Sequence, residues 1–177
     1  MVRMVLIAGW LGIAGGIQSM ALNIGDVAPP FTATIADGTT LSLKDYEGQW
    51  VVLYFYPKAD TPGCTKQSCS LRDGYGDIRA EGAVLLGASL DSVSKQLAFR
   101  EKYDLPFPLI ADENKVIAKA YNVLAPLGIF AHRKTFLIDP EGHIAHIFSS
   151  VNVADHDAEV LAVLRSLKAP ETSISED

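Results

Sequence analysis

A continuous apolar segment, Trp50–Tyr56, runs directly into a Pro- and Gly-containing loop and then a cysteine, and this junction constrains the fold more than any other feature. The segment is aromatic and β-branched throughout, which is typical of a strand covered on both faces. Cys64 follows the loop and opens a segment with helical character. A thiol there faces unpaired N–H groups and the positive end of the helix dipole, and both stabilise the reactive thiolate.

The rest of the pattern predicts an α/β fold with a central mixed sheet and helices on its faces. Asp37-Gly38, between two short strand-like segments, indicates an N-terminal hairpin. Further strands are expected over 83–90, 107–110, 134–139 and 143–148, and helices over 64–79, 92–103, 114–121 and 155–168. Active sites of such sheets lie beyond the carboxyl ends of central strands, and Cys64 lies there.

Composition excludes several classes of function. The 177 residues are enough for one well-buried domain, and 49% hydrophobic with 20% charged residues is ordinary for a soluble globular protein. A net charge of −6 without any basic run argues against a nucleic-acid partner. Two cysteines are too few for a disulfide-built scaffold. The histidines form no zinc-type cluster and have no partner pattern, so we interpret all four as non-catalytic: His132, His143, His146 and His156.

The N-terminal 21 residues differ from the remainder. Arg3, the apolar stretch Val5–Ile17 and small residues before Leu22 predict a cleaved signal peptide and export to the periplasm or an equivalent lumen. The stretch is short for a membrane span, so no stable membrane insertion is expected after its removal. Two alternatives stay open: an uncleaved anchor, or a true start at Met20 and a cytoplasmic protein. Residues 22–169 are expected to form one domain, followed by a disordered acidic tail over 170–177.

Cys64 and Cys69 are the only cysteines, five positions apart. In one intact helix their Cα atoms would lie about 8–9 Å apart. A disulfide needs a separation of about 4.4–6.8 Å, so the bond requires local unwinding. The pair therefore suits a catalytic cycle better than a permanent crosslink. In that cycle a peroxide oxidises Cys64 to sulfenic acid, Cys69 condenses with it to a disulfide, and an external dithiol reduces the disulfide.

A peroxidase must also hold the peroxide in line and stabilise the charge that builds on its oxygens. The hydroxyl of Thr61 can donate to or accept from a bound peroxide, and backbone N–H groups near Gly63 and Cys64 can donate. Pro57 and Pro62 stiffen the loop. A fixed cation is still needed, and arginine suits this role because it stays charged at any working pH.

The motif Pro57-x-x-x-Thr61-x-x-Cys64 resembles the active-site signature of the peroxiredoxins. The longer run from Tyr56 to Asp73 looks like the PrxQ, or bacterioferritin comigratory protein, subfamily. The similarity covers about residues 25–168 and includes the flanking runs Ser89-Leu-Asp-Ser92 and Arg133-Lys-Thr-Phe-Leu-Ile-Asp139.

This resemblance implies a thioredoxin-like fold and a monomeric thiol peroxidase with no metal, haem or other cofactor. It makes Cys64 the peroxidatic residue and Cys69 the resolving residue, and it places Arg133 where the family keeps its pocket arginine. Pro57, Thr61 and Gly63 would form the rest of the peroxide pocket. The implied substrates are hydrogen peroxide and organic hydroperoxides, and the implied reductant is thioredoxin or a similar protein.

Two departures from the subfamily pattern bear on function. Gln96 stands where relatives often carry His, and we assign it no role. The expected irregular loop over 123–131 looks shorter than in many relatives, which leaves substrate preference and reductant docking undefined.

Two other functions stay open on the sequence alone. One is a protein disulfide oxidoreductase, although that chemistry usually uses a Cys-x-x-Cys pair and residue 67 is Gln. The other is a non-enzymatic domain in which Cys64 and Cys69 form a structural disulfide.

Overall fold

The computed structural model describes residues 21–169. Residues 1–20 of the predicted leader and the predicted tail over 170–177 lie outside the described residues. Within the described range, no helix has the length and apolar character needed to cross a membrane.

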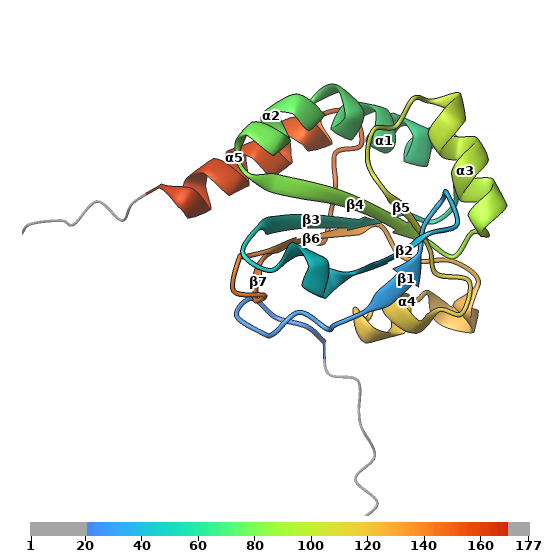
Figure 1. The fold of residues 1–177 in the computed structure, drawn as a ribbon, viewed down its shortest axis with the longest axis horizontal. Helices are drawn as coiled ribbons and strands as arrows, with labels where there is room; N and C mark the ends of the chain where they lie inside the picture. The colour runs from blue at the N-terminus through green and yellow to red at the C-terminus, as the bar shows by residue number, and fades with distance from the viewer. Residues whose placement is uncertain (1–20, 170–177) are drawn as a thin grey trace, which may run out of the picture.

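Five strands form one mixed sheet in the order β5-β4-β3-β6-β7 (Figure 1). Strands β3, β4 and β5 run parallel, β6 pairs antiparallel with β3, and β7 pairs antiparallel with β6. Two further strands, β1 and β2, pair as a separate hairpin. The expected mixed sheet and N-terminal hairpin are therefore confirmed. The strands are β1 (Thr32–Thr34), β2 (Thr40–Ser42), β3 (Trp50–Phe55), β4 (Ala83–Ser89), β5 (Leu109–Ala111), β6 (Lys134–Ile138) and β7 (Ile144–Phe148).

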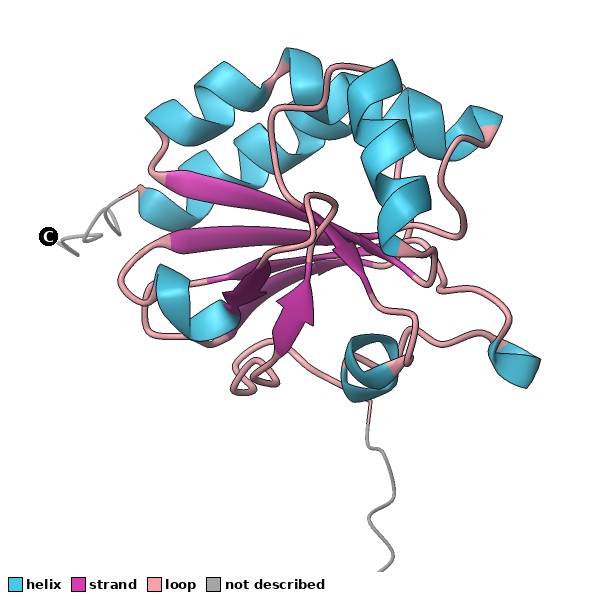
Figure 2. Cartoon of the chain, turned by 45° about the vertical axis from the view of Figure 1, so that its right-hand side comes forward, coloured by secondary structure: helices cyan, strands magenta, loops and turns pink. Residues whose placement is uncertain are grey.

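Helices cover both faces of this sheet, as Figures 1 and 2 show. Helices α1, α2, α3 and α5 lie over one face, and α4 and the β1–β2 hairpin lie over the other. Short 3₁₀ turns, η1 and η2, complete the described elements. The helical elements are η1 (Leu43–Tyr46), α1 (Pro62–Asp73), α2 (Tyr75–Ala80), α3 (Val93–Lys102), α4 (Val116–Ala120), η2 (Pro126–Gly128) and α5 (His156–Lys168).

Two expected helices have different bounds in the structure. The single helix expected over 64–79 is divided at Gly74, where the backbone leaves helical geometry (φ −87°, ψ 2°). The helix expected over 114–121 starts only at Val116, because Lys115 adopts a left-handed conformation (φ 61°). The irregular loop over 123–131 contains the η2 turn, and its ends pair through a β-bridge between Leu124 and Ala131.

Alternate residues of β3 enter different cores. Val51, Leu53 and Phe55 pack in the core shared with the hairpin and α4. Val52, Tyr54 and the following Tyr56 pack in the core shared with the other four helices. This two-sided burial confirms the interpretation of the apolar segment as a covered central strand. Cys64 belongs to the second core, so the thiol lies between helix α1 and the sheet.

Gly87 of β4 tests how tightly this second core is packed. A Cβ added at Gly87 would lie 2.7 Å from both Leu109 Cδ2 and Tyr54 Cζ. We expect Gly87→Ala to lower the free energy of unfolding by about 1–3 kcal/mol, because an overpacked core must strain its side chains or shift its backbone. Gly76→Ala in α2 is the matched control, since no atom lies within 4 Å of the added Cβ. Urea titration checks both, and equal stability of the two variants would contradict the packing argument.

Sheet topology explains how distant residues reach Cys64. Strand β6 is antiparallel to β3, and Lys134 pairs with Phe55. Arg133, which directly precedes β6, therefore lies at the carboxyl end of β3. The loop that leads from β3 into α1 begins at the same end.

Candidate active site

Helix α1 begins at Pro62, with Thr61 as its N-cap residue in extended conformation (φ −101°, ψ 152°). Proline is well suited to the first helical position, because the N–H that it lacks would be unpaired there. The first helical hydrogen bond runs from the Thr65 N–H to the Thr61 carbonyl at 2.8 Å. The N–H groups of Gly63 and Cys64 precede this bond, so the helix itself does not use them. They can donate to a ligand beside the thiol.

The guanidinium of Arg133 faces the thiol directly. Its Nη2 donates to Cys64 Sγ at 3.3 Å, and its Nη1 donates to Oε1 of Gln67, one helical turn further along α1. Cys64 is 1% exposed. Arg133 forms no ion pair with a carboxylate among residues 21–169. Its charge is therefore available to the sulfur and to any negative charge that develops next to it.

Gln67 and Gly63 complete the immediate surroundings of the guanidinium. Gln67 is fully buried, and its Nε2 has no hydrogen-bond partner among the described residues. A Cβ added at Gly63 would lie 3.4 Å from Arg133 Nη2, so glycine leaves room for the guanidinium to approach the helix. Sequence reasoning assigned Gly63 to the pocket but gave Gln67 no role, because a glutamine within a helix carries no distinctive signal.

The hydroxyl of Thr61 is already used in one hydrogen bond. Its hydroxyl donates to the carbonyl of Lys58 at 2.9 Å, and it makes no capping bond to α1. With the proton used in this way, the hydroxyl oxygen is left to accept a hydrogen bond. In this arrangement the hydroxyl has an acceptor site free but no proton to donate to a ligand.

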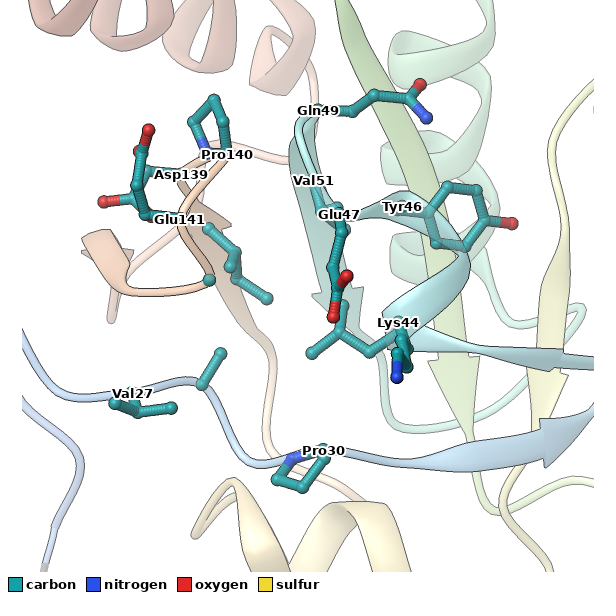
Figure 3. Close-up of a pocket in the computed structure, with 14 residues that line it drawn as sticks. Val27, Pro30, Lys44, Tyr46, Glu47, Gln49, Val51, Asp139, Pro140 and Glu141 are labelled. Atoms are coloured by element: carbon teal, nitrogen blue, oxygen red, sulfur yellow. The ribbon is translucent and has the colours of Figure 1, made fainter.

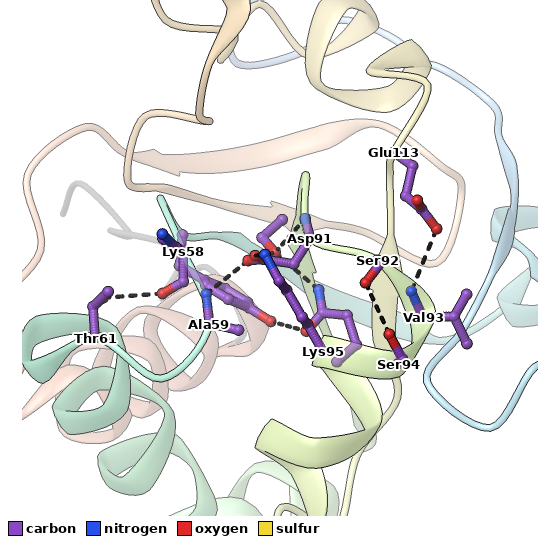
Figure 4. A network of polar contacts seen from close by, with 12 residues as sticks. Lys58, Ala59, Thr61, Asp91, Ser92, Val93, Ser94, Lys95 and Glu113 are labelled. Carbon is purple, nitrogen blue, oxygen red and sulfur yellow. Dashed lines mark hydrogen bonds and ion pairs between the residues drawn. The ribbon is translucent and has the colours of Figure 1, made fainter.

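The loop between β3 and α1 is fixed by side chains from the β4–α3 region (Figure 4). Asp91 accepts from the Ala59 N–H at 2.7 Å and from the Ser89 hydroxyl at 2.8 Å. Asp60 adopts a left-handed conformation (φ 58°) and accepts from Lys102 Nζ and the Tyr103 hydroxyl. The bond from Lys102, followed by that from Tyr103, holds the pKa of Asp60 below its ordinary value. These contacts hold in place the loop that carries Thr61.

Gln96 has a structural role that the sequence interpretation missed. It is fully buried, accepts from the Tyr56 hydroxyl, and donates through Nε2 to Ser89 Oγ at 2.9 Å and to the Ile110 carbonyl at 2.8 Å. Burial raises the pKa of Tyr56 well above its ordinary value, so this hydroxyl stays a donor. Gln96 therefore joins the carboxyl ends of the three parallel strands to α3.

Cys69 lies on the same helix as Cys64 and is partly exposed, and both thiols are free. Because α1 is continuous between them, the expected separation of about 8–9 Å between their Cα atoms applies. The structure therefore gathers Pro57, Thr61, Gly63, Cys64 and Arg133 at one end of the sheet, with Cys69 one and a half turns away. The functional roles of these six residues stay predictions.

His156 contradicts the expectation that no histidine has a partner pattern. Its ring is fully buried, with Nε2 2.9 Å from Thr135 Oγ1 and Nδ1 2.9 Å from Glu159 Oε2. If Nδ1 carries the proton and donates to Glu159, then Nε2 can accept from the Thr135 hydroxyl. Burial lowers the pKa of His156 below 6.5, although the hydrogen bond to Glu159 opposes this effect.

We therefore expect His156 to make stability depend on pH. The unfolded chain takes up a proton near pH 6.5, whereas the folded chain does so only at lower pH, so the free energy of unfolding falls as pH drops below about 6.5. His156→Gln should show a smaller loss between pH 7.5 and pH 5.5 in urea titrations. His132→Gln, which removes an exposed histidine, should keep the wild-type pH dependence. Equal pH dependence in all three proteins would contradict this prediction.

Two cavities differ in their relation to the thiol. One, of about 290 Å³, lies at the amino end of β3 and includes Val51, Glu47 and Pro140 in its lining (Figure 3). It is at the far end of the sheet from Cys64, and we assign it no role. The other, of about 620 Å³, adjoins the active-site loop through Pro57 and Lys58. The rest of its lining comes from Leu90, Asp91, Ser92, Lys95, Glu113, Ile129 and Phe130.

The family model described as "AhpC/TSA family" matches residues 24–147, which include all the residues described at the thiol. The chain belongs to the AhpC/TSA family. Peroxiredoxin Bcp of Bacillus subtilis is 40% identical over 154 residues, which cover 84% of this chain and 98% of that protein. The resemblance to the PrxQ subfamily and the assignment to the peroxidase class are therefore confirmed.

Solved structures agree with this assignment. A mutant of PrxQ from Xylella fastidiosa is 32% identical, with a TM-score of 0.80 over 85% of this chain and 99% of that chain. A structure of bacterioferritin comigratory protein from Xanthomonas campestris, described in connection with its alkyl peroxide reduction activity, is 32% identical. Its TM-score is 0.73 over 77% of this chain and 91% of that chain. The thioredoxin-like fold expected from the resemblance is confirmed.

Proposed function

We propose that this peroxiredoxin reduces hydrogen peroxide and organic hydroperoxides through Cys64, that Cys69 resolves the oxidised sulfur, and that thioredoxin or a similar dithiol protein completes the cycle. One observation carries the proposal. The guanidinium of Arg133, which has no carboxylate partner among the described residues, lies 3.3 Å from the buried sulfur of Cys64 in the first turn of α1. This arrangement places a permanent cation beside the sulfur, where it can also polarise a peroxide.

In the first step the Cys64 thiolate attacks one peroxide oxygen. An S–O bond forms as the O–O bond breaks, and the second oxygen leaves as alcohol or water after taking up a proton. Negative charge builds on the oxygens in the transition state. Arg133 and the N–H groups of Gly63 and Cys64 can stabilise that charge, while Thr61 accepts from the peroxide O–H and keeps it in line.

In the second step Cys69 attacks the Cys64 sulfenic acid. An S–S bond forms, the S–O bond breaks and water leaves. Two electrons and two protons from an external dithiol then restore both thiols. The helical position of both cysteines requires that part of α1 unwinds before this step, because their Cα atoms must approach to about 4.4–6.8 Å.

The substrate range follows from the site and from one relative. Hydrogen peroxide needs only the contacts around Cys64. For organic hydroperoxides, the cavity beside Pro57 offers apolar surface from Leu90, Ile129 and Phe130. The described activity of the Xanthomonas campestris relative toward alkyl peroxides supports the same proposal.

Export and a monomeric state are further proposals. The leader pattern before Leu22 supports removal of the first 21 residues and a periplasmic or luminal location. N-terminal sequencing of the protein from its native host tests this, because a start at Met20 would instead indicate a cytoplasmic protein. Sedimentation of the reduced protein tests the monomer.

Cys69→Ser tests the assigned chemistry most directly. Reduced wild-type protein treated with one equivalent of hydrogen peroxide should lose two protons by intact mass, as a disulfide forms. Cys69→Ser should consume the peroxide at a similar rate but gain one oxygen at Cys64, or more under excess peroxide. Thiols that stay unreacted for minutes in the wild-type protein would rule out the peroxidase mechanism. A disulfide-bonded wild type that resists reduction would favour the structural alternative.

A further inference from the structure

The part of helix α1 that carries Cys69 is hydrogen-bonded to helix α5 through the next residue, Ser70. Ser70 Oγ donates to Asp157 Oδ1 at 2.6 Å and accepts from the Asp157 N–H at 3.1 Å. Ser70 is 7% exposed. Asp157 lies in the first turn of α5, where its N–H has no partner within the helix. The Ser70 hydroxyl thus accepts from a backbone N–H that α5 leaves unpaired, and the Asp157 carboxylate accepts the proton of that hydroxyl.

The close approach of the two helices continues to the end of α1. A Cβ added at Gly74 would lie 2.5 Å from Asp157 Cβ, so glycine is needed for this contact. Ser68, on the other side of Cys69, bonds to the buried Tyr54 hydroxyl at 3.1 Å. Cys69 therefore lies between two serines that are each held in place. Disulfide formation must bring the Cα atoms of Cys64 and Cys69 to about 4.4–6.8 Å, which displaces this part of α1.

We infer that Asp157 is a positioning residue that sets how fast Cys69 reaches the oxidised Cys64. The inference rests on the proposed function, because it concerns the resolving step of that cycle. The carboxylate stabilises the helical state of α1, in which the peroxide pocket is assembled. Release of Ser70 must precede disulfide formation. The contact therefore lengthens the lifetime of the Cys64 sulfenic acid.

A longer-lived sulfenic acid is open to a competing reaction. A second peroxide can add another oxygen, which forms a second S–O bond, breaks the O–O bond and releases alcohol or water. The product is a sulfinic acid that Cys69 does not resolve. Asp157 thus influences what fraction of the Cys64 sulfenic acid becomes a disulfide and what fraction becomes a sulfinic acid. It does so without contact with the substrate or the sulfur.

The test compares Asp157→Ala with wild type in single-turnover oxidation by one equivalent of hydrogen peroxide, followed by acid quench and intact mass. Alanine keeps the Cβ that packs on Gly74 and removes only the carboxylate. We expect unchanged oxidation of Cys64 and disulfide formation about five- to tenfold faster, as loss of one net hydrogen bond implies. The peroxide concentration that over-oxidises half of Cys64 should rise by a similar factor. Asp157→Asn, which keeps an acceptor for Ser70, should stay within about twofold of wild type.

Two controls separate positioning from general loosening of α5. Asp155→Ala removes a carboxylate from the same helix terminus that bonds to Asn152 rather than to α1, so its resolution rate should equal that of wild type. In a Ser70→Ala background, Asp157→Ala should have no further effect, because the two residues act through one contact.

Equal resolution rates in Asp157→Ala and wild type would overturn the inference while leaving the proposed cycle intact. Acceleration by Asp155→Ala to the same extent would also overturn it. A wild type that forms no Cys64–Cys69 disulfide would overturn the proposed function and this inference together.

Discussion

Replacing Cys64 with serine is expected to abolish peroxide reduction while leaving the fold in place. A serine hydroxyl is not ionised at neutral pH and is not oxidised by peroxide, so the chemical step has no nucleophile. We expect turnover to fall by at least about a thousandfold in a coupled assay with a dithiol reductant. Serine nearly matches the volume of cysteine, and its oxygen can still accept from Arg133, so burial without a partner is avoided.

Stability measurements decide between this prediction and the non-enzymatic alternative. Circular dichroism and the urea midpoint of Cys64→Ser should match those of reduced wild type. Cys69→Ser is the matched control, because it removes the other thiol of α1 and should still reduce one equivalent of peroxide. A Cys64→Ser protein that keeps more than a few per cent of wild-type turnover would contradict the assignment of the nucleophile.

Much of the fold could be predicted because its signals are local. The uninterrupted apolar character of Trp50–Tyr56 follows from packing on both faces, and the structure shows those two cores. The position of Cys64 at a helix start follows from the Pro- and Gly-containing loop before it. Arg133 could be placed only through the family resemblance, since 69 residues separate it from Cys64. The antiparallel pairing of β6 with β3 brings the two together.

The polar contacts that support the site could not be predicted, because each joins residues far apart in the chain. Gln96 and Tyr56 are 40 residues apart, and Ser70 and Asp157 are 87 residues apart. No local pattern distinguishes a glutamine that bonds to a buried tyrosine from one that faces solvent. The break at Gly74 has the same origin. A glycine within a helical pattern indicates weakness, but only the packed structure shows that Asp157 occupies the space of a side chain.

Arg133→Met is expected to slow the oxidation of Cys64 by about 100- to 1,000-fold, the usual cost of removing one donor that stabilises transition-state charge. Methionine keeps the length and apolar stem of arginine but offers no donor to Cys64 Sγ or to Gln67 Oε1. Negative charge that develops on the breaking O–O bond in the transition state should lack its cation. Stopped-flow oxidation with hydrogen peroxide measures the rate.

Two variants show whether charge alone or the geometry of the guanidinium matters. Arg133→Lys keeps the charge, but one ammonium cannot match the planar fork that reaches Cys64 and Gln67 together, so we expect a rate between those of wild type and Arg133→Met. Arg79→Met, on the exposed side of α2, removes a cation far from the thiol and should leave the rate unchanged. Because the Cys64 sulfur is buried, added salt should not reproduce the effect of Arg133→Met. An Arg133→Met protein that oxidises at the wild-type rate would mean that the N–H groups at the start of α1 suffice to activate the sulfur.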